Sequence, residues 1–472
     1  MRVSRRALLA GAGAVAFGSG LPSHRSFAEP EHKEYRLTAA PATVNLTGDG
    51  YPDTAVWAYD GKVPGPELRV RQGEPVRVLV SNRLGEDTTV HWHGIRLPNA
   101  IDGVPGLTQK PVRPGESFVY EFTPPDAGTF WYHPHANSLE QLGRGLAGAL
   151  IVEEREPIAV DRDLLWLIQD WRLQEDGRIA PGFGNHMEAG MSGRIGNTVT
   201  LNGRVTERAS VNAGERIRLR IVNAALARIV ALRFEGHQPI VLAYDGQPSD
   251  PHPPEEGRLT LGPAMRADVI IDMTGEPGHS YAVTDDFYRD LAYKLVDVVY
   301  GPEKPARKDL PEPAKLVRNP LSEPDLVSAE RHEIALQGGM MGGMGMMGRG
   351  GMMGGMMRMG GPSWAMNGMS MTGDSQRDMP PLLTLNRGRS YILELRNETA
   401  WWHPMHLHGH SFQVVSRNGK AHALKEWRDT VLVPPRESVE IAFVADNPGD
   451  WMFHCHVADH QETGMMATLR IS

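Results

Sequence analysis

One short pattern occurs three times along the chain, and this repeat limits the folds that are open to it. In each copy a glycine precedes an asparagine by nine residues. The three pairs are Gly73 and Asn82, Gly214 and Asn223, and Gly388 and Asn397. Between the two, apolar residues alternate with mostly polar ones, as in a β-strand with one buried face. The repeat therefore predicts three equivalent β-strands.

Each copy continues with a second pair of predicted strands. These are 117–122 and 128–133, 267–272 and 278–283, and 438–444 and 449–454. Helical periodicity is scarce, and 52 Gly and 36 Pro suit a turn-rich globular protein. We predict an all-β protein of three consecutive Greek-key β-barrel or sandwich domains, each of about 130 to 165 residues. We place them at 29–156, 157–305 and 306–472, with boundaries in Pro-rich stretches.

The first 28 residues have the features of an export signal. Arg5 and Arg6 precede a weakly apolar run that ends near Leu21, and Ser26-Phe27-Ala28 has small residues at both recognition positions of a cleavage site. This order is typical of a twin-arginine signal, and it predicts export by the twin-arginine machinery to the periplasm.

The rest of the chain excludes two classes of partner. No later stretch approaches the roughly 18 to 20 apolar residues that a spanning helix needs, so we expect no membrane span in the mature protein. The net charge of −8 makes nucleic acid a poor partner. We expect a monomer.

Histidine pairs mark the first and third copies but not the second. The four pairs are His91 and His93, His133 and His135, His406 and His408, and His454 and His456. Near the first of these positions the second copy has Arg233 and Glu235, which we expect to make structural contacts. Side chains two apart on a strand share a face, so the pairs predict an eight-imidazole cage between domains one and three. Domain two would be a spacer, and imidazole alone leaves Zn, Cu, Fe or Ni open.

The single cysteine selects the metal. Cys455 lies between two cage histidines, so strand alternation turns it to the opposite face. With His403, His460 and Met465 it supplies a His₂Cys set and a weak axial thioether, the ligands of a blue copper electron-transfer centre. Zinc would need neither eight paired histidines nor this second set. The remaining alternative is a buried structural cysteine.

Four stretches resemble the copper motifs of the three-domain multicopper oxidases. They are HWHG at 91–94, HPH at 133–135, HPMHLHG at 403–409 and HCHVADHQETGM at 454–465. The resemblance spans the mature chain and implies three cupredoxin-like domains that bind four copper ions. It implies a type 1 copper at His403, Cys455, His460 and axial Met465, and a type 2 copper at His91 and His406. It implies a type 3 pair at His93, His133, His135, His408, His454 and His456.

The same resemblance implies the reaction. Such enzymes take electrons singly from a donor at the type 1 copper and reduce O₂ to water at the three-copper cluster. Protons are also needed, and two acids adjoin ligand motifs, Asp102 nine residues after His93 and Asp459 directly before His460. Similar family positions hold acids thought to relay protons, so we predict catalytic roles for both. The alternative is that each acid only orients a histidine.

A methionine-rich insertion at 338–373 suggests the electron donor. Between Met340 and Met371 lie 13 of the 23 methionines, and no periodic core face can be drawn through them. Thioethers select Cu(I), so the insertion is predicted to hold extra Cu(I) near the type 1 site. Similar insertions mark copper-efflux oxidases, which oxidise Cu(I) and protect the periplasm. The alternative is a low-complexity segment without a role.

Other functions stay open at this point. Trp401 and Trp402 precede His403, where copper-oxidising relatives tend to have methionine or acid, and this favours a general laccase that oxidises phenols and amines. A non-enzymatic periplasmic copper-binding or envelope scaffold protein would not need the complete ligand set. A two-domain copper nitrite reductase is disfavoured by the three repeats.

Overall fold

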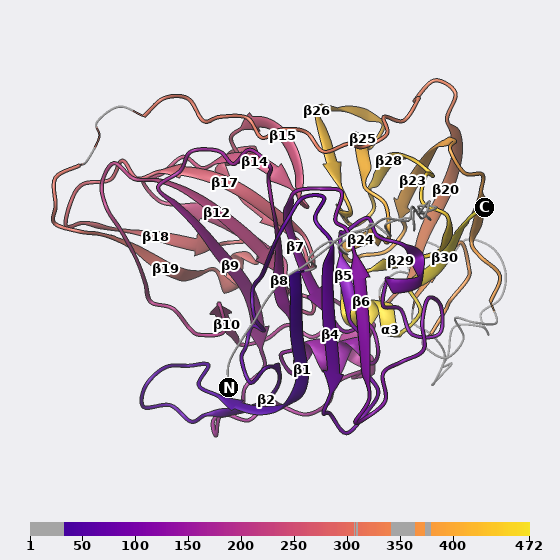
Figure 1. The fold of residues 1–472 in the computed structure, drawn as a ribbon, viewed down its shortest axis with the longest axis horizontal. Coiled ribbons are helices and arrows are strands. Elements are labelled where there is room, and N and C mark those ends of the chain that lie inside the picture. The colour runs from indigo at the N-terminus through magenta and orange to yellow at the C-terminus, as the bar shows by residue number, and fades with distance from the viewer. Residues whose placement is uncertain (1–32, 306, 308–309, 341–363, 373–378) are drawn as a thin grey trace, which may run out of the picture. The chain divides into compact units, whose positions relative to one another are not determined.

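The computed structural model describes residues 33–305, 307, 310–340, 364–372 and 379–472. Strands dominate these residues and form six sheets, two for each repeat of the sequence (Figure 1). The predicted all-β class is thereby confirmed. The predicted signal at 1–28 lies outside the described residues. Among the described residues, no helix is long and apolar enough to cross a membrane.

The first strand group consists of two four-stranded sheets, β2-β1-β4-β6 and β3-β8-β7-β5. Its strands are β1 (Lys33–Val44), β2 (Thr54–Tyr59), β3 (Leu68–Arg71), β4 (Val76–Asn82), β5 (His91–His93), β6 (Ser117–Phe122), β7 (Gly128–His133) and β8 (Gly148–Glu153). Two short helical elements, η1 (Asn99–Ile101) and α1 (Ser138–Gly143), lie in its loops.

The second group has the sheets β10-β9-β12-β17-β14-β15 and β11-β19-β18-β13-β16. Its strands are β9 (Arg162–Trp171), β10 (Thr198–Leu201), β11 (Arg208–Val211), β12 (Arg216–Asn223), β13 (Val230–Phe234), β14 (Ile240–Tyr244), β15 (Gln247–His252), β16 (Leu259–Leu261), β17 (Arg266–Asp272), β18 (Ser280–Asp285) and β19 (Tyr293–Tyr300). Its helical elements are α2 (His186–Ala189), η2 (Glu255–Gly257) and η3 (Arg289–Leu291).

The third group has the sheets β21-β20-β23-β28-β25-β26 and β22-β30-β29-β24-β27. Its elements are β20 (Glu330–Gly338), β21 (Trp364–Met366), β22 (Leu383–Leu385), β23 (Ser390–Asn397), β24 (His403–Leu407), β25 (Phe412–Arg417), β26 (Lys420–Arg428), β27 (Thr430–Val433), β28 (Ser438–Val444), β29 (Gly449–Cys455), α3 (Ala458–Glu462) and β30 (Met466–Ile471). The boundaries at 156/157 and 305/306 stay a prediction; β8 ends at Glu153 and β9 begins at Arg162.

The three groups share one strand pairing. The repeat strands β4, β12 and β23 each lie between a parallel first strand and an antiparallel later strand. Buried apolar residues of groups one and three form one continuous cluster, whereas those of group two form a separate core. Domains one and three therefore pack together through their apolar interiors as well as through their histidines.

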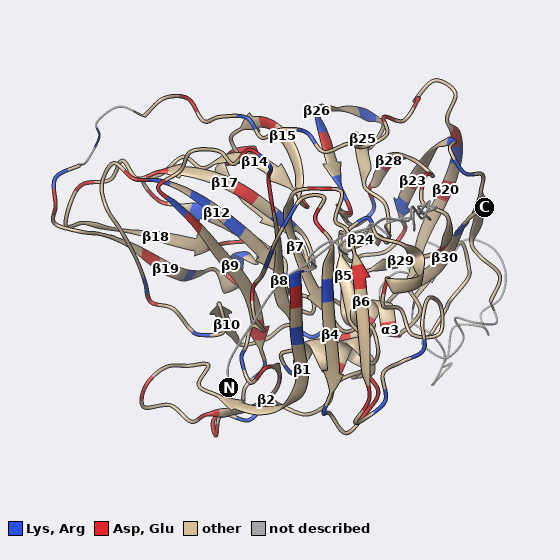
Figure 2. Ribbon diagram, viewed as in Figure 1, with Lys and Arg blue, Asp and Glu red and all other residues tan. Residues whose placement is uncertain are grey.

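Strand β12 shows why alternation alone underestimates burial. Its isoleucine and leucine residues enter the core of domain two, and its three arginines lie on the other face. The strand register sets Arg216 and Arg220 opposite Asp272 and Asp268 of β17, and Figure 2 shows basic residues on β12 and acidic residues on β17. Arg218 donates to Glu154 Oε1 at 2.6 Å, and Arg220 donates to Thr129 Oγ1 at 2.9 Å. Both arginines are buried, because this face packs against domain one.

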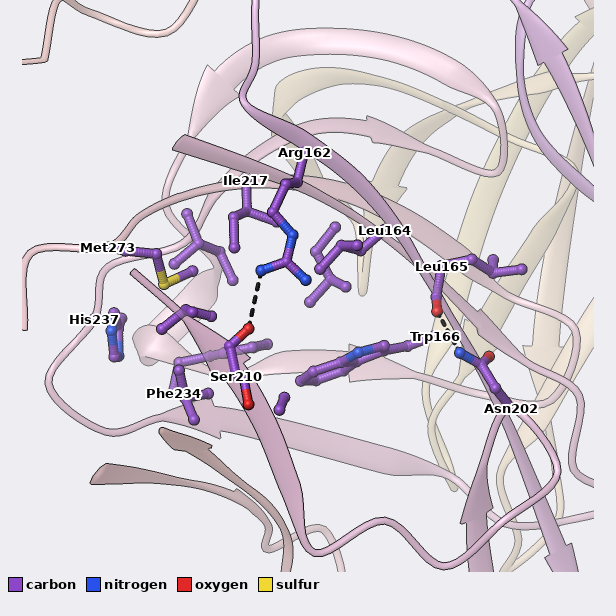
Figure 3. A pocket seen from close by; sticks show the side chains of 15 residues that line it. Arg162, Leu164, Leu165, Trp166, Asn202, Ser210, Ile217, Phe234, His237 and Met273 are labelled. Atoms are coloured by element: carbon purple, nitrogen blue, oxygen red, sulfur yellow. Dashed lines mark hydrogen bonds between the residues drawn. The ribbon is translucent and has the colours of Figure 1, made fainter. Parts of the chain in front are cut away.

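A cavity of about 210 Å³ lies inside domain two (Figure 3). Trp166, Ile217 and Phe234 are among the apolar residues that line it, and Arg162 donates to Ser210 O beside it. None of the predicted copper ligands lines this cavity, so it is not part of the candidate metal site.

One expectation about the methionine insertion is wrong. Its described end forms β21, in which Trp364 and Met366 are buried, so a stretch predicted to have no core face contributes an edge strand to the sheet. Residues 341–363 and 373, which make up most of the insertion, lie outside the described residues.

The repeated asparagine makes the same kind of side-chain hydrogen bonds in all three domains. Asn223 is buried at the end of β12, donates to Arg228 O at 2.8 Å and Leu261 O at 2.9 Å, and accepts from Ala225 N. Asn82 and Asn397 bond to their following loops in the same way. The amide thus ties down the loop that leads from the repeat strand to the next strand, which carries histidines in copies one and three.

We expect Asn223→Ala to lower the free energy of unfolding of the metal-free protein by about 2 to 4 kcal/mol, because the substitution leaves buried carbonyl and N–H groups without partners. Urea unfolding measures this change. The control is Asn212→Ala, an exposed position in the same domain, which should change the stability by less than about 0.5 kcal/mol. Equal effects of the two substitutions would contradict the role assigned to the repeated asparagine.

Candidate metal centres

Strand pairing brings the histidine pairs together. In domain one, β5 pairs with β7, so that His91 lies opposite His133. In domain three, β24 pairs with β29, so that His406 lies opposite His454. These four strands lie close together in Figure 1, and histidine rings from the two domains are in direct contact.

The eight histidines form a closed, buried group. The His91 ring stacks on His408 with centroids 3.9 Å apart, and the His93 ring stacks on His406 at 3.7 Å. The nitrogens His408 Nε2 and His454 Nε2 face each other at 3.1 Å. All eight side chains are buried. The structure therefore builds the predicted cage, while the ion that each ring binds stays a prediction.

The chemistry of this group fits a metal cluster. Burial lowers the pKa of seven of the eight rings: His93, His133, His135, His406, His408, His454 and His456. Several buried nitrogens have no hydrogen-bond partner in the described structure, among them His91 Nε2, His133 Nε2 and His406 Nε2. Neutral imidazoles with free lone pairs are what a metal requires, and leaving them unpaired in a dry interior costs free energy.

A second group lies on the other face of β29. Cys455 Sγ is 3.6 Å from His403 Nδ1 and 3.6 Å from His460 Nδ1, and the two nitrogens are 3.2 Å apart. Burial raises the pKa of the Cys455 thiol and lowers that of His460 to about 3. Met465 is buried in the same cluster, and its carbonyl accepts from Cys455 N at 3.0 Å. Two imidazoles and one sulfur thus converge on one point.

Comparison with known proteins decides the family. Three family models described as multicopper oxidase match residues 41–157, 163–297 and 354–472. The chain belongs to the multicopper oxidases. It is accordingly an oxidoreductase that uses O₂, and it employs copper cofactors.

Its relatives align along almost the whole chain. A multicopper oxidase of Mycobacterium tuberculosis is 30% identical over 92% of this chain and 86% of its own length. The structure of a multicopper oxidase from Pseudomonas thermotolerans superposes with a TM-score of 0.81 at 37% identity, covering 94% of this chain and all of the other. A Campylobacter jejuni multicopper oxidase, described as a metallo-oxidase, superposes with a TM-score of 0.76 at 28% identity, covering 93% and 91%.

The two predicted catalytic acids lie in different places in this multicopper oxidase. Asp102 is buried at the cage, where its Oδ2 accepts from His408 Nδ1 at 2.8 Å and its carbonyl accepts from His91 Nδ1 at 2.7 Å. Asp102 thus holds one histidine from each domain. This contact supports the orienting role and leaves proton relay as a further possibility for the same carboxylate.

Asp459 lies beside the second group, which we call the sulfur site because Cys455 is part of it. Its Oδ2 accepts from Arg194 N of domain two at 2.8 Å, and burial raises its pKa to about 6. In the described part of the chain, its side-chain hydrogen bonds include none to a cage histidine, and its Oδ1 is buried without a partner. The geometry therefore gives no support to a proton path from Asp459 to the cage.

Domain two covers the sulfur site. His460 is fully buried, and its Nε2 donates to Met191 O at 2.8 Å. Trp364 packs on the His460 ring with centroids 4.1 Å apart and donates from Nε1 to Ala189 O at 2.7 Å. The expectation that domain two is only a spacer is wrong. Sequence reasoning missed this cover because residues 186–191 belong to no repeat motif.

Asp429 is a second residue that sequence reasoning missed. It lies between β26 and β27, its Oδ1 is 3.2 Å from His93 Nε2, and its carbonyl accepts from His406 Nδ1 at 2.8 Å. No spacing in the sequence marks it, because it reaches His406 only through the pairing of β24 with β27, and the strands β25 and β26 lie between these two in the sequence. Arg233 and Glu235 make the expected structural contacts, with Asp286 and with Ala282 N.

We expect Asp102→Asn to slow the reoxidation of the fully reduced protein by O₂ about 10- to 100-fold, because the cage loses a carboxylate that holds His408. Asp459→Asn should change this rate by less than about twofold, because that carboxylate faces Arg194. Stopped-flow absorbance after mixing with O₂ measures both rates. Equal slowing by the two substitutions would contradict this division of roles.

Proposed function

We propose that this multicopper oxidase oxidises Cu(I) to Cu(II) with O₂ as the electron acceptor, and that it serves copper tolerance. The observation that carries the proposal is a group of exposed methionines on the cover of the sulfur site. We further propose that the protein acts in the periplasm after twin-arginine export directed by residues 1–28.

The proposed cofactor is a set of four copper ions. His403, Cys455, His460 and axial Met465 would hold type 1 copper, and His91 and His406 would hold type 2 copper. The type 3 pair would be held by His93, His133, His135, His408, His454 and His456. Copper at these residues would supply one-electron oxidation at the sulfur site and four-electron reduction of O₂ to water at the cage.

The methionines on the cover favour Cu(I) as the donor. Met187, Met191 and Met340 are 59%, 36% and 39% exposed, and they are the methionines among the large exposed apolar residues of the described structure. Met340 N donates to Gly190 O, and Met191 O accepts from His460 Nε2 at 2.8 Å. Three soft thioethers are thus held on the segments that cover an electron-accepting histidine. Such ligands select Cu(I) over harder ions.

The same cover works against bulky organic donors. The His460 imidazole is buried, and its outer nitrogen is bonded to the Met191 carbonyl, so a phenol ring has no direct contact with it. Trp401, the first of the two tryptophans before His403, donates from Nε1 to Met340 O at 3.0 Å and so helps to hold the cover. The metallo-oxidase description of the Campylobacter jejuni relative is in line with a metal donor.

We expect the triple substitution Met187→Leu, Met191→Leu and Met340→Leu to lower kcat/KM for Cu(I) by at least about tenfold, because leucine keeps the apolar bulk but offers no ligand. Oxygen consumption with Cu(I), held in solution by a weak chelator, measures this rate. Oxidation of a small phenol is the control and should change by less than about twofold. A loss shared by both donors would mean that the substitutions damage the type 1 site itself.

Deletion of 341–363 tests the rest of the methionine insertion and keeps β21, whose Trp364 packs on His460. If the insertion delivers Cu(I), the deletion should reduce Cu(I) oxidation at low concentrations and leave phenol oxidation unchanged. Undiminished Cu(I) oxidation in both the deletion and the triple variant, together with faster phenol turnover, would favour a general laccase.

We expect the copper-loaded protein to have an intense blue absorption band and the spin-resonance signals of type 1 and type 2 copper. Cys455→Ser should remove the blue band and the type 1 signal and keep the type 2 signal, because serine offers no soft thiolate. Met465→Leu is the matched control, since it removes only the axial thioether and should stay blue. Bound copper without a blue band in the unmodified protein would return it to the storage or scaffold class.

A further inference from the structure

A buried arginine of domain two reaches the junction of all three domains. Arg266 is the first residue of β17, and its side chain is fully buried. Its guanidinium donates two hydrogen bonds to Asp429 of domain three, at 2.7 Å to Oδ1 and 2.6 Å to Oδ2. Its Nε donates to Thr129 O of domain one at 3.2 Å. This two-pronged geometry fixes the carboxylate in position and orientation.

The Asp429 carboxylate that Arg266 holds also contacts the cage. Asp429 Oδ1 is 3.2 Å from His93 Nε2, and the Asp429 carbonyl accepts from His406 Nδ1 at 2.8 Å. The rings of His93 and His406 stack on each other. One aspartate therefore sets the orientation of one histidine from each copper-binding domain.

The contact with Asp429 decides which ring nitrogen of His93 carries the proton. A carboxylate only accepts, so His93 Nε2 carries the proton and donates to it. This leaves His93 Nδ1 as the nitrogen with a free lone pair, and Nδ1 is buried without a partner in the described structure. The Asp429 contact thus selects which nitrogen of His93 faces the cage.

The residues around Arg266 allow its guanidinium to approach Asp429 closely. Asp245, also of domain two, accepts from Arg266 N at 2.8 Å through Oδ1 and from Thr430 N at 3.2 Å through Oδ2. Gly94 lies against the ion pair, and a Cβ there would be 2.4 Å from both Arg266 Nη2 and Asp429 Oδ2. The glycine after the first histidine pair is therefore needed for the arginine to fit.

We propose that Arg266 is a positioning residue of the copper cluster, which acts through Asp429 to hold His93 and His406 in ligand geometry. The domain without copper ligands would in this way complete the site shared by the other two. The inference rests on the copper assignment proposed above.

The matched control is Arg220, another buried arginine of domain two. It bonds to Asp163 and Asp268 and donates to Thr129 Oγ1 of domain one. In the described residues its hydrogen bonds include none to a histidine or to Asp429. Arg266→Met and Arg220→Met therefore remove equally buried charges at the interface of domains one and two, and only the first disturbs the cage.

The test compares copper retention with the stability of the metal-free protein. We expect both variants to lower the Tm of the metal-free protein. Arg266→Met alone should lose cage copper to a competing chelator at least about tenfold faster than the unmodified protein, with a weakened or altered type 2 signal and an intact blue band. Retention equal to that of the unmodified protein, or equal losses in both variants, would overturn the inference.

Arg266→Lys covers the case in which Arg266→Met does not fold. Lysine keeps the charge opposite Asp429 but not the two-pronged grip, so we expect an intermediate rate of copper loss with a near-normal Tm. Unchanged copper retention in this variant would also overturn the inference. The unmodified protein separates the two hypotheses, because failure to bind four copper ions there would refute the copper assignment and not the role of Arg266.

Discussion

The histidine cage depends on the burial of uncharged imidazole rings between domains one and three. All eight rings are buried, and burial lowers the pKa of seven of them. Unpaired nitrogens in such a place are unfavourable until a metal takes their lone pairs. The shared apolar cluster of the two domains offsets this cost, since its burial packs the two domains together.

The second site uses the opposite face of the same strand, β29. Because β29 alternates faces, His454 and His456 point to the cage while Cys455 points to His403 and His460. The two sites are therefore joined by covalent bonds within three residues. This short link suits electron transfer from a mononuclear site to a cluster, and it follows from strand geometry alone.

Domain two carries no predicted ligands, yet it controls access and support. Its residues 186–191 cover His460, and Arg266 holds Asp429, one of two aspartates that contact the cage. The arginines of β12 form buried ion pairs with Asp268 of β17 inside domain two, and the same face contacts domain one through the Arg218–Glu154 ion pair and the Arg220–Thr129 hydrogen bond. Such pairs contribute modest stability, but leaving one partner alone is costly, so they define how the domains meet.

The all-β class, the repeat strands and the histidines and cysteine at both sites could be predicted because each depends on local spacing. A strand has a period of two, so His-x-His places two rings on one face, and the residue between them on the other, in any fold that keeps the strand. The repeated asparagine could be recognised for a similar reason, since its bonds reach its own following loop and one neighbouring strand.

Tertiary structure alone decided which distant residues meet these motifs. Arg266 and Asp429 are 163 positions apart, and His93 and Asp429 are 336 apart, and no local period connects them. The different surroundings of Asp102 and Asp459 were hidden in the same way, because a position beside a ligand does not say which side of the strand a carboxylate faces. Sequence determined the predicted ligands through short-range geometry, whereas the packing of three domains determined what holds, covers and orients them.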